Sequence, residues 1–125
     1  MGYLEDVLKA AECVEENLMK PFTLRDVASR VRYSPYHFHR LFHAVAGETL
    51  GAYARKQRLA EAAHELAETR RRVSDIALDY QFQSQEGFTR AFVRMFGVTP
   101  TRYRKRPTAM ALTPANGSPE RSSCI

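Results

Sequence analysis

The sequence predicts an all-α protein with about seven helices, which form two helix-turn-helix subdomains joined by one long helix. Three observations lead to this fold class: apolar residues recur with the period of a helix, capping residues precede the apolar runs, and residues 24–55 are repeated as residues 73–105. The 125 residues suffice for one compact domain and are too few for an additional sensor domain. We expect that domain at residues 1–106.

The internal repeat defines the organisation of the chain. At an offset of 49 residues, Asp26-Val27-Ala28 pairs with Asp75-Ile76-Ala77, and Tyr33 pairs with Phe82. The offset then becomes 50, which places one extra residue in the second turn. The pairs that follow are Ser34 with Ser84, Phe38 with Phe88, Arg40 with Arg90, Phe42 with Phe92, Gly47 with Gly97, Thr49 with Thr99 and Tyr53 with Tyr103. So many matches in one order indicate two copies of one supersecondary unit.

The first helix-turn-helix unit is expected at about residues 3–48. It begins with a helix from about Tyr3 to Met19 whose buried side carries Leu4, Val7, Leu8, Ala11, Val14 and Leu18, and Pro21 follows its end. Thr23 and Asp26 have the spacing of a capping box for a helix from Leu24 to about Val31. Ser34 followed by Pro35 begins the next helix, in which the buried stripe is Phe38, Leu41, Phe42 and Val45.

A long linker helix is expected from Leu50 to about Glu68, with Thr49 as its cap and with Tyr53, Leu59, Ala60, Ala63, Leu66 and Ala67 available for burial. At about 1.5 Å per residue it is about 28 Å long, close to the roughly 34 Å between successive major-groove sites on one face of DNA. The second unit follows at about residues 72–106, with Ser84 as a cap, the stripe Phe88, Ala91, Phe92 and Met95, and a last helix from Thr99-Pro100 that includes Tyr103. Residues 107–125 are rich in Pro, Ser and Thr, which predicts a disordered tail.

The two stripes leave corresponding residues facing outward. These are Tyr36, His37, His39, Arg40 and His43 in the first unit, and Gln85, Glu86, Thr89, Arg90 and Arg94 in the second. Polar residues on one helix can simply face solvent, but the same arrangement twice beside a short capped turn favours recognition of a partner. The net charge of +5 suggests that this partner is anionic. The excess of positive charge lies after residue 20, because residues 1–20 hold two lysines against five acidic residues.

Three segments resemble the AraC/XylS family of bacterial transcription regulators, and within it the single-domain group of MarA, SoxS and the DNA-binding part of Rob. They are the run Tyr33-Ser34-Pro35-Tyr36-His37-Phe38-His39-Arg40-Leu41-Phe42, then Ser74-Asp75-Ile76-Ala77, then the run from Phe82 to Phe92 with Phe96-Gly97-Val98-Thr99-Pro100-Thr101-Arg102-Tyr103-Arg104. The resemblance covers about Val7 to Arg106. It implies sequence-specific binding of a monomer to an asymmetric double-stranded DNA site of about two helical turns, and recruitment of RNA polymerase.

The resemblance also implies roles for individual residues. Base reading falls on Tyr36, His39 and Arg40 in the first unit and on Gln85, Glu86 and Arg90 in the second. Arginine can donate two bonds to guanine and glutamine suits adenine, each good pair being worth about 1–3 kcal/mol of discrimination. The remaining candidates for DNA contact, mainly to phosphates, are Arg32, His37, His43, Arg55, Arg70, Thr89, Arg94 and Arg102.

The chain departs from the family pattern in both turns and in both recognition helices. Arg32 and Gln81 replace the usual turn glycine, where a left-handed backbone costs a non-glycine residue about 1 kcal/mol. We hypothesise that the Arg32 side chain contacts a DNA phosphate, which a glycine at this position could not do. Tyr36 stands where relatives often have tryptophan and Glu86 where they have glutamine, and because a carboxylate accepts from cytosine and repels phosphate, the preferred DNA sequence should differ from theirs.

Other classes of protein are less well supported by the residues. His37, His39, His43 and His64 suggest an enzyme or a metal site, but no further ligand or nucleophile completes either, and we expect no cofactor. Cys13 and Cys124 form no disulfide pattern, and no transmembrane run or signal peptide is present, so we expect a cytoplasmic, nucleoid-associated protein. Repression instead of activation stays open, as does binding of RNA or an acidic protein. With no sensor domain, we expect control by abundance.

Overall fold

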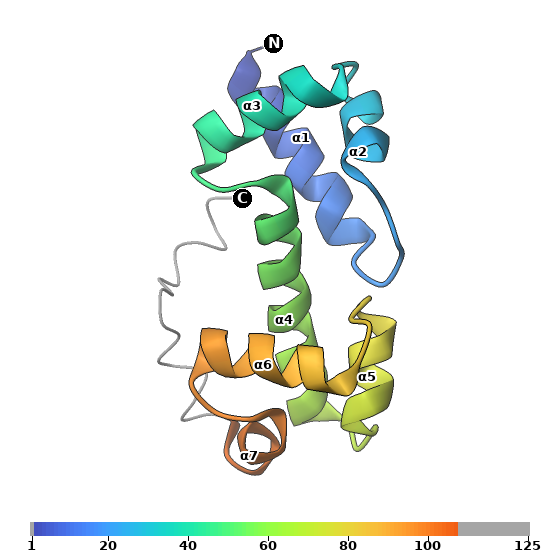
Figure 1. Cartoon of the computed structure of the whole chain (residues 1–125), viewed down its shortest axis with the longest axis vertical. Helices are drawn as coiled ribbons and strands as arrows, with labels where there is room; N and C mark the ends of the chain where they lie inside the picture. The colour runs from blue at the N-terminus through green and yellow to red at the C-terminus, as the bar shows by residue number, and fades with distance from the viewer. Residues whose placement is uncertain (1, 108–125) are drawn as a thin grey trace. The chain divides into compact units, whose positions relative to one another are not determined.

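The computed structural model describes residues 2–107, and within this range the chain is all-helical (Figure 1). Its seven helices are α1 (Tyr3–Glu16), α2 (Leu24–Arg30), α3 (Pro35–Ala46), α4 (Leu50–Glu68), α5 (Val73–Asp79), α6 (Gln85–Phe96) and α7 (Pro100–Lys105). The predicted fold class is therefore confirmed. The tail predicted at 107–125 lies, from residue 108 onward, outside the described residues.

The helices belong to two compact units, one ending at Gln57 and one beginning at Arg58. The division falls inside α4, which is continuous from Leu50 to Glu68 as expected, so this helix contributes its first turns to one unit and its last turns to the other.

The first unit is built by α1, α2 and α3, each of which packs against the other two, together with the start of α4. Its buried residues are Val7, Ala10, Ala11, Val14, Leu18, Val27, Ala28, Phe38, Phe42, Leu50, Tyr53 and Ala54. The capping box predicted for α2 is present, since the Thr23 side chain accepts from the Asp26 amide and the Asp26 carboxylate accepts from the Thr23 amide. Two hydroxyl-to-carboxylate hydrogen bonds of 2.6 Å tie α1 to the rest of the unit, from Tyr33 to Asp6 and from Tyr53 to Glu15.

The second unit consists of the end of α4 with α5, α6 and α7, in which α6 packs against both α5 and α7. Its buried hydrophobic residues are Leu59, Ala62, Ala63, Leu66, Ile76, Ala77, Tyr80, Phe88, Phe92 and Tyr103. Arg104 joins α7 to the end of α4: its Nε donates to the Leu66 carbonyl at 3.0 Å and its Nη2 to the Arg71 carbonyl at 2.6 Å. Arg71 in turn pairs with Asp79 of α5 at 2.6 Å.

Four aromatic rings in each unit occupy equivalent positions and pack in the same order, and the second unit adds Phe96 against Phe92 and Tyr103. In the first unit, the ring centroids from Tyr33 to Phe38 to Phe42 to Tyr53 are 6.2, 5.8 and 5.8 Å apart. The equivalent rings of the second, Phe82, Phe88, Phe92 and Tyr103, are 5.2, 5.6 and 5.5 Å apart. Neighbouring rings in both series pack tilted or edge-on, the arrangement that their quadrupoles favour. The repeat in the sequence is therefore a repeat in three dimensions.

The turns show the same equivalence and the one extra residue. Residues 31–34 connect α2 to α3, whereas residues 80–84 connect α5 to α6. Arg32 and Gln81 both have left-handed backbones, with φ of 66° and 70°. Gly47 and Gly97, which cap the ends of α3 and α6, both have φ of 83°, a conformation that glycine adopts without steric cost.

Several expectations about burial were wrong. The helix ends differ less: α1 ends at Glu16, three residues before the expected end at about Met19, and α2 ends at Arg30, one residue before about Val31. Leu4 is 61% exposed and Val45 40% exposed, and Ala67 is also exposed. All three lie in the first or last turn of a helix. Periodicity identifies the apolar side of a helix, but a residue on that side is buried only where another element reaches it.

Candidate nucleic-acid interface

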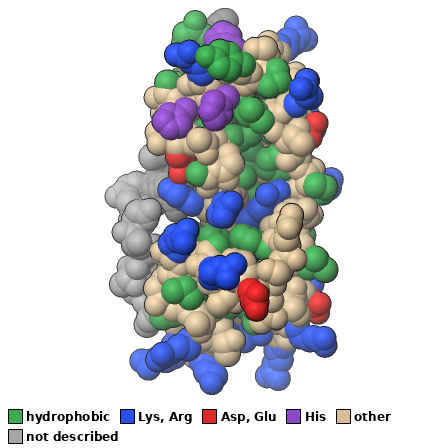
Figure 2. Space-filling model, viewed as in Figure 1, with side chains coloured by type: hydrophobic (Ala, Val, Ile, Leu, Met, Phe, Trp, Pro, Cys, Tyr) green, Lys and Arg blue, Asp and Glu red, His purple; other side chains and the backbone are tan. Residues whose placement is uncertain are grey.

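Helix α3 begins at a fully formed cap and presents its polar side to solvent. The Ser34 hydroxyl accepts from the His37 amide at 3.2 Å, and Pro35 occupies the first helical position. Phe38 and Phe42 hold the opposite side in the core. The five outward residues predicted for this helix are all exposed, namely Tyr36, His37, His39, Arg40 and His43. Figure 2 shows the histidine side chains gathered on one face over this unit.

Tyr36 and Arg40 are in direct contact on the exposed side of α3. Arg40 Nη1 donates a hydrogen bond of 3.0 Å to the Tyr36 hydroxyl, and the guanidinium carbon lies 5.7 Å from the centre of the Tyr36 ring. An open hollow of about 420 Å³ beside this pair is lined by Tyr3, Tyr36, His37, Arg40 and Leu41. Sequence reasoning did not include Tyr3, because it assigned the first helix to packing alone.

His37 and Tyr33 connect this surface to the core. The His37 ring packs edge-on against Tyr33 at 5.1 Å between centroids. The hydrogen bond from Tyr33 to Asp6, with a smaller contribution from burial, raises the pKa of Tyr33 to about 12, because the neighbouring carboxylate disfavours a phenolate. Tyr33 therefore stays neutral and keeps its bond to α1 at physiological pH.

Helix α6 repeats the arrangement with different side chains. The Ser84 hydroxyl accepts from the Gly87 amide at 3.0 Å, and Phe88 and Phe92 are buried. A Cβ on residue 87 would lie 3.3 Å from the Ser84 hydroxyl, a close contact that glycine avoids. Of the outward residues predicted here, Gln85, Glu86, Arg90 and Arg94 are exposed and Thr89 is half-buried.

The remaining candidates for phosphate contact lie outside the recognition helices. Arg32, Arg55, Arg70 and Arg102 are all exposed, in the first turn, in α4, between α4 and α5, and in α7 respectively. Arg71 and Arg104 differ from them, because both are engaged within the second unit through the ion pair and carbonyl contacts described above. The hydrogen bond to Asp79 raises the pKa of Arg71 above its ordinary value.

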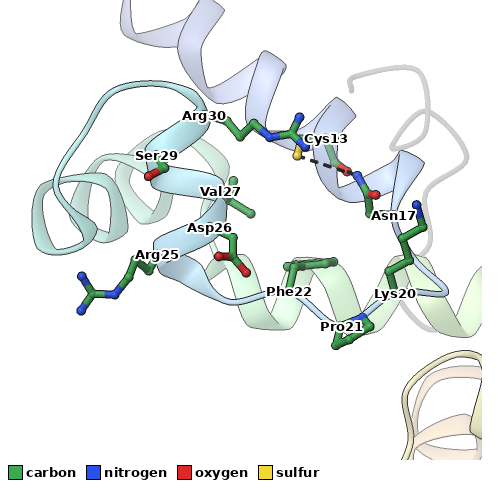
Figure 3. A pocket seen from close by; sticks show the side chains of 10 residues that line it. All are labelled: Cys13, Asn17, Lys20, Pro21, Phe22, Arg25, Asp26, Val27, Ser29 and Arg30. Atoms are coloured by element: carbon green, nitrogen blue, oxygen red, sulfur yellow. Dashed lines mark hydrogen bonds between the residues drawn. The ribbon is translucent and has the colours of Figure 1, made fainter.

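A separate pocket of about 430 Å³ lies between the end of α1 and α2 (Figure 3). Its lining includes Cys13, Phe22, Val27 and Arg30 and no residue of α3. The Asn17 amide donates to the Cys13 carbonyl at 2.7 Å within it. In residues 2–107 no three histidine, cysteine, aspartate or glutamate side chains are grouped as metal ligands would be. None of the described helices is long and apolar enough to traverse a bilayer.

Residues 27–106 match a family model described as "Helix-turn-helix domain". Relatives include the transposon Tn10 TetD protein of Escherichia coli, 47% identical over 92 residues, which are 74% of this chain and 67% of that protein. The HTH-type transcriptional activator AarP of Providencia stuartii is 41% identical over 95 residues, covering 76% of this chain and 70% of that protein. The chain belongs to the AraC/XylS family.

A solved structure and a longer relative complete the comparison. The crystal structure of an AraC-type transcriptional regulator from Chromobacterium violaceum matches with a TM-score of 0.80 and 26% identity over 84% of this chain and 94% of the other. The right origin-binding protein of Escherichia coli K12 is 45% identical over 94 residues, and these 75% of this chain match only 32% of that longer protein. Family and fold are those of DNA-binding transcription regulators and not of enzymes.

Proposed function

We propose that this AraC/XylS protein is a transcription activator that binds double-stranded DNA by inserting α3 and α6 into successive major grooves. One observation carries the proposal: two equivalent capped helices, held by equivalent aromatic cores, each present an exposed arginine at the same repeat position, Arg40 and Arg90. An exposed helix of this kind fits the major groove, where arginine can donate a fork of bonds to guanine.

Base reading is assigned to Tyr36, His39 and Arg40 in α3 and to Gln85, Glu86 and Arg90 in α6. Their exposure leaves them accessible to base edges. The exposed cations Arg32, Arg55, Arg70, Arg94 and Arg102, with His37, His43 and Thr89, are assigned to the sugar-phosphate backbone or to neighbouring contacts, which add affinity and salt dependence without reading sequence.

We further infer that the chain binds as a monomer to an asymmetric site of about two helical turns. The two recognition helices carry different outward residues, so a single chain can read two different half-sites. Activation through contact with RNA polymerase is proposed because AarP is named a transcriptional activator. Repression by the same fold is the alternative when the site overlaps a promoter. Acting on DNA, the protein would be associated with the nucleoid in the cytoplasm.

Competition binding tests the proposal. A duplex selected from a random pool by the purified chain is labelled and challenged with unlabelled specific duplex, random duplex and RNA, over a series of salt concentrations. We expect the specific duplex to compete at least about 10³-fold better than random duplex, and affinity to fall steeply as salt rises. Equal competition by all three nucleic acids would instead favour a general basic binding module.

A further inference from the structure

We propose that Tyr36 is a positioning residue for Arg40, holding its guanidinium ready for guanine before DNA arrives. The inference rests on the proposed function and deepens it at the first recognition helix. Tyr36 precedes Arg40 by one helical turn on the exposed side of α3, where side chains four residues apart are neighbours. The tyrosine holds the guanidinium in two ways, through a hydrogen bond of 3.0 Å to its hydroxyl and through its ring face at 5.7 Å.

The donors that remain on Arg40 match the acceptors of guanine. A guanidinium has five N–H groups, and the hydrogen bond to Tyr36 uses one of the two on Nη1. The edge formed by Nε and Nη2 keeps its parallel donors, which can bind O6 and N7 of one guanine together. The contact with Tyr36 is therefore compatible with base reading by Arg40.

A neutral partner restrains Arg40 without cancelling its charge. In α6 the position equivalent to Tyr36 is Glu86, four residues before Arg90, and within residues 2–107 neither a hydrogen bond nor an ion pair joins those two side chains. A carboxylate that did hold an arginine would compete with DNA for it. Restraining a long side chain in the free protein reduces the conformational entropy that is lost on binding. Arg40 in α3 is therefore preorganised for binding, whereas Arg90 in α6 is not.

The pair is also open to an approaching base. Tyr36 is 69% exposed, and the hollow of about 420 Å³ lined by Tyr3, Tyr36, His37, Arg40 and Leu41 lies beside the guanidinium. Substitutions of Tyr36 should therefore leave the buried core intact. This makes the pair suitable for a double-mutant cycle, in which the fold is constant and only recognition changes.

The experiment measures selectivity, defined as the dissociation constant for random duplex divided by that for the selected duplex. Tyr36→Phe removes the hydroxyl and keeps the ring, and we expect selectivity to fall about three- to tenfold, the value of one net hydrogen bond. In an Arg40→Ala background the same substitution should change selectivity less than about twofold, because its effect passes through Arg40. Tyr33→Phe is the matched control: it removes the hydroxyl that binds Asp6, so it should lower the thermal midpoint and leave selectivity unchanged.

The possible outcomes separate the hypotheses. An equal loss of selectivity in both Arg40 backgrounds would mean that the Tyr36 hydroxyl contacts DNA by itself, and this would overturn the positioning role. No loss in either background would overturn it as well. If the wild-type chain selects no duplex at all, the proposed function fails and the inference fails with it, a result visible before any substitution is made.

Discussion

Arg32 and Gln81 are side-chain-bearing residues at backbone positions suited to glycine. Their φ angles of 66° and 70° place both in the left-handed region, which costs a residue with a Cβ about 1–2 kcal/mol. The Tyr33 amide donates to the Ala28 carbonyl and the Phe82 amide to the Ala77 carbonyl, both at 3.0 Å, so the two turns close in the same way. The repeated fold imposes the conformation even where the sequence does not favour it.

We therefore expect Arg32→Gly and Gln81→Gly each to raise the free energy of unfolding by about 0.5–1 kcal/mol, because relief of steric strain exceeds the added entropy of the unfolded chain. Chemical denaturation measures this, and Gly47→Ala, at φ 83°, should have the opposite effect. Only Arg32→Gly should also reduce the slope of log affinity against log salt, by about one phosphate contact. A slope unchanged from wild type would remove the phosphate contact assigned to Arg32.

The Tyr33 hydroxyl should make stability depend on alkaline pH. Its pKa is raised from 10.0 to about 12 in the folded protein, first by the hydrogen bond to Asp6, so the unfolded chain loses this proton at lower pH than the folded chain. The stabilisation is complete below pH 10 and is lost as pH rises from 10 to about 12. Burial also raises the pKa values of Tyr80 and Tyr103, so Tyr33→Phe is compared with wild type at each pH. Their thermal midpoints should converge above pH 10, and a constant difference would contradict this account.

At the scale of elements, the three short helices depend on packing, and two of them, α2 and α7, also begin with a side-chain cap. α2 and α5 have 7 residues each and α7 has 6, lengths at which isolated helices are unstable in water. Side-chain caps at Thr23, Ser34, Thr49, Ser84 and Thr99 satisfy free amides at the starts of five helices. Packing against longer helices supplies the rest of the stability.

Arg104 joins the last helix to two segments that lie far from it in the sequence. Its two hydrogen bonds reach carbonyls at the end of α4 and in the segment before α5, so Arg104→Gln should lower the free energy of unfolding by about 1–2 kcal/mol. Arg102→Gln is the matched control in the same helix. In the described part of the chain the Arg102 side chain is exposed and makes no hydrogen bond, so this change should stay within about 0.5 kcal/mol of wild type. Equal destabilisation by both substitutions would show that Arg104 does not anchor α7.

At the scale of the whole molecule, the proposed function predicts that α3 and α6 read different halves of the DNA site. Arg40→Ala should relax base preference in one half of the site and Arg90→Ala in the other, with the halves separated by about ten base pairs. Each change should cost about 1–3 kcal/mol of discrimination at the affected base pair. Binding-site selection with each variant measures this. Loss of preference in the same half for both variants would contradict the two-helix arrangement.

Much of the architecture was predictable because its causes are local in the chain. Helical periodicity, Thr23 and Ser34 as caps, and the matched positions of the repeat all depend on residues a few positions apart or on direct comparison of two segments. The same information identified the exposed sides of α3 and α6, since a buried aromatic stripe determines the opposite face. The roles of the residues on those faces stay predictions.

Tertiary structure alone decided which helix ends are covered and which charged side chains are already engaged. Leu4 and Val45 carry the apolar pattern yet are exposed, because burial requires a neighbouring element that periodicity does not specify. Arg104 resembles the exposed arginines around it in sequence, but its bonds to Leu66 and Arg71 cross more than thirty residues. The position and the start of a helix are indicated by residues within a turn or two of chain, whereas such contacts depend on where distant segments meet.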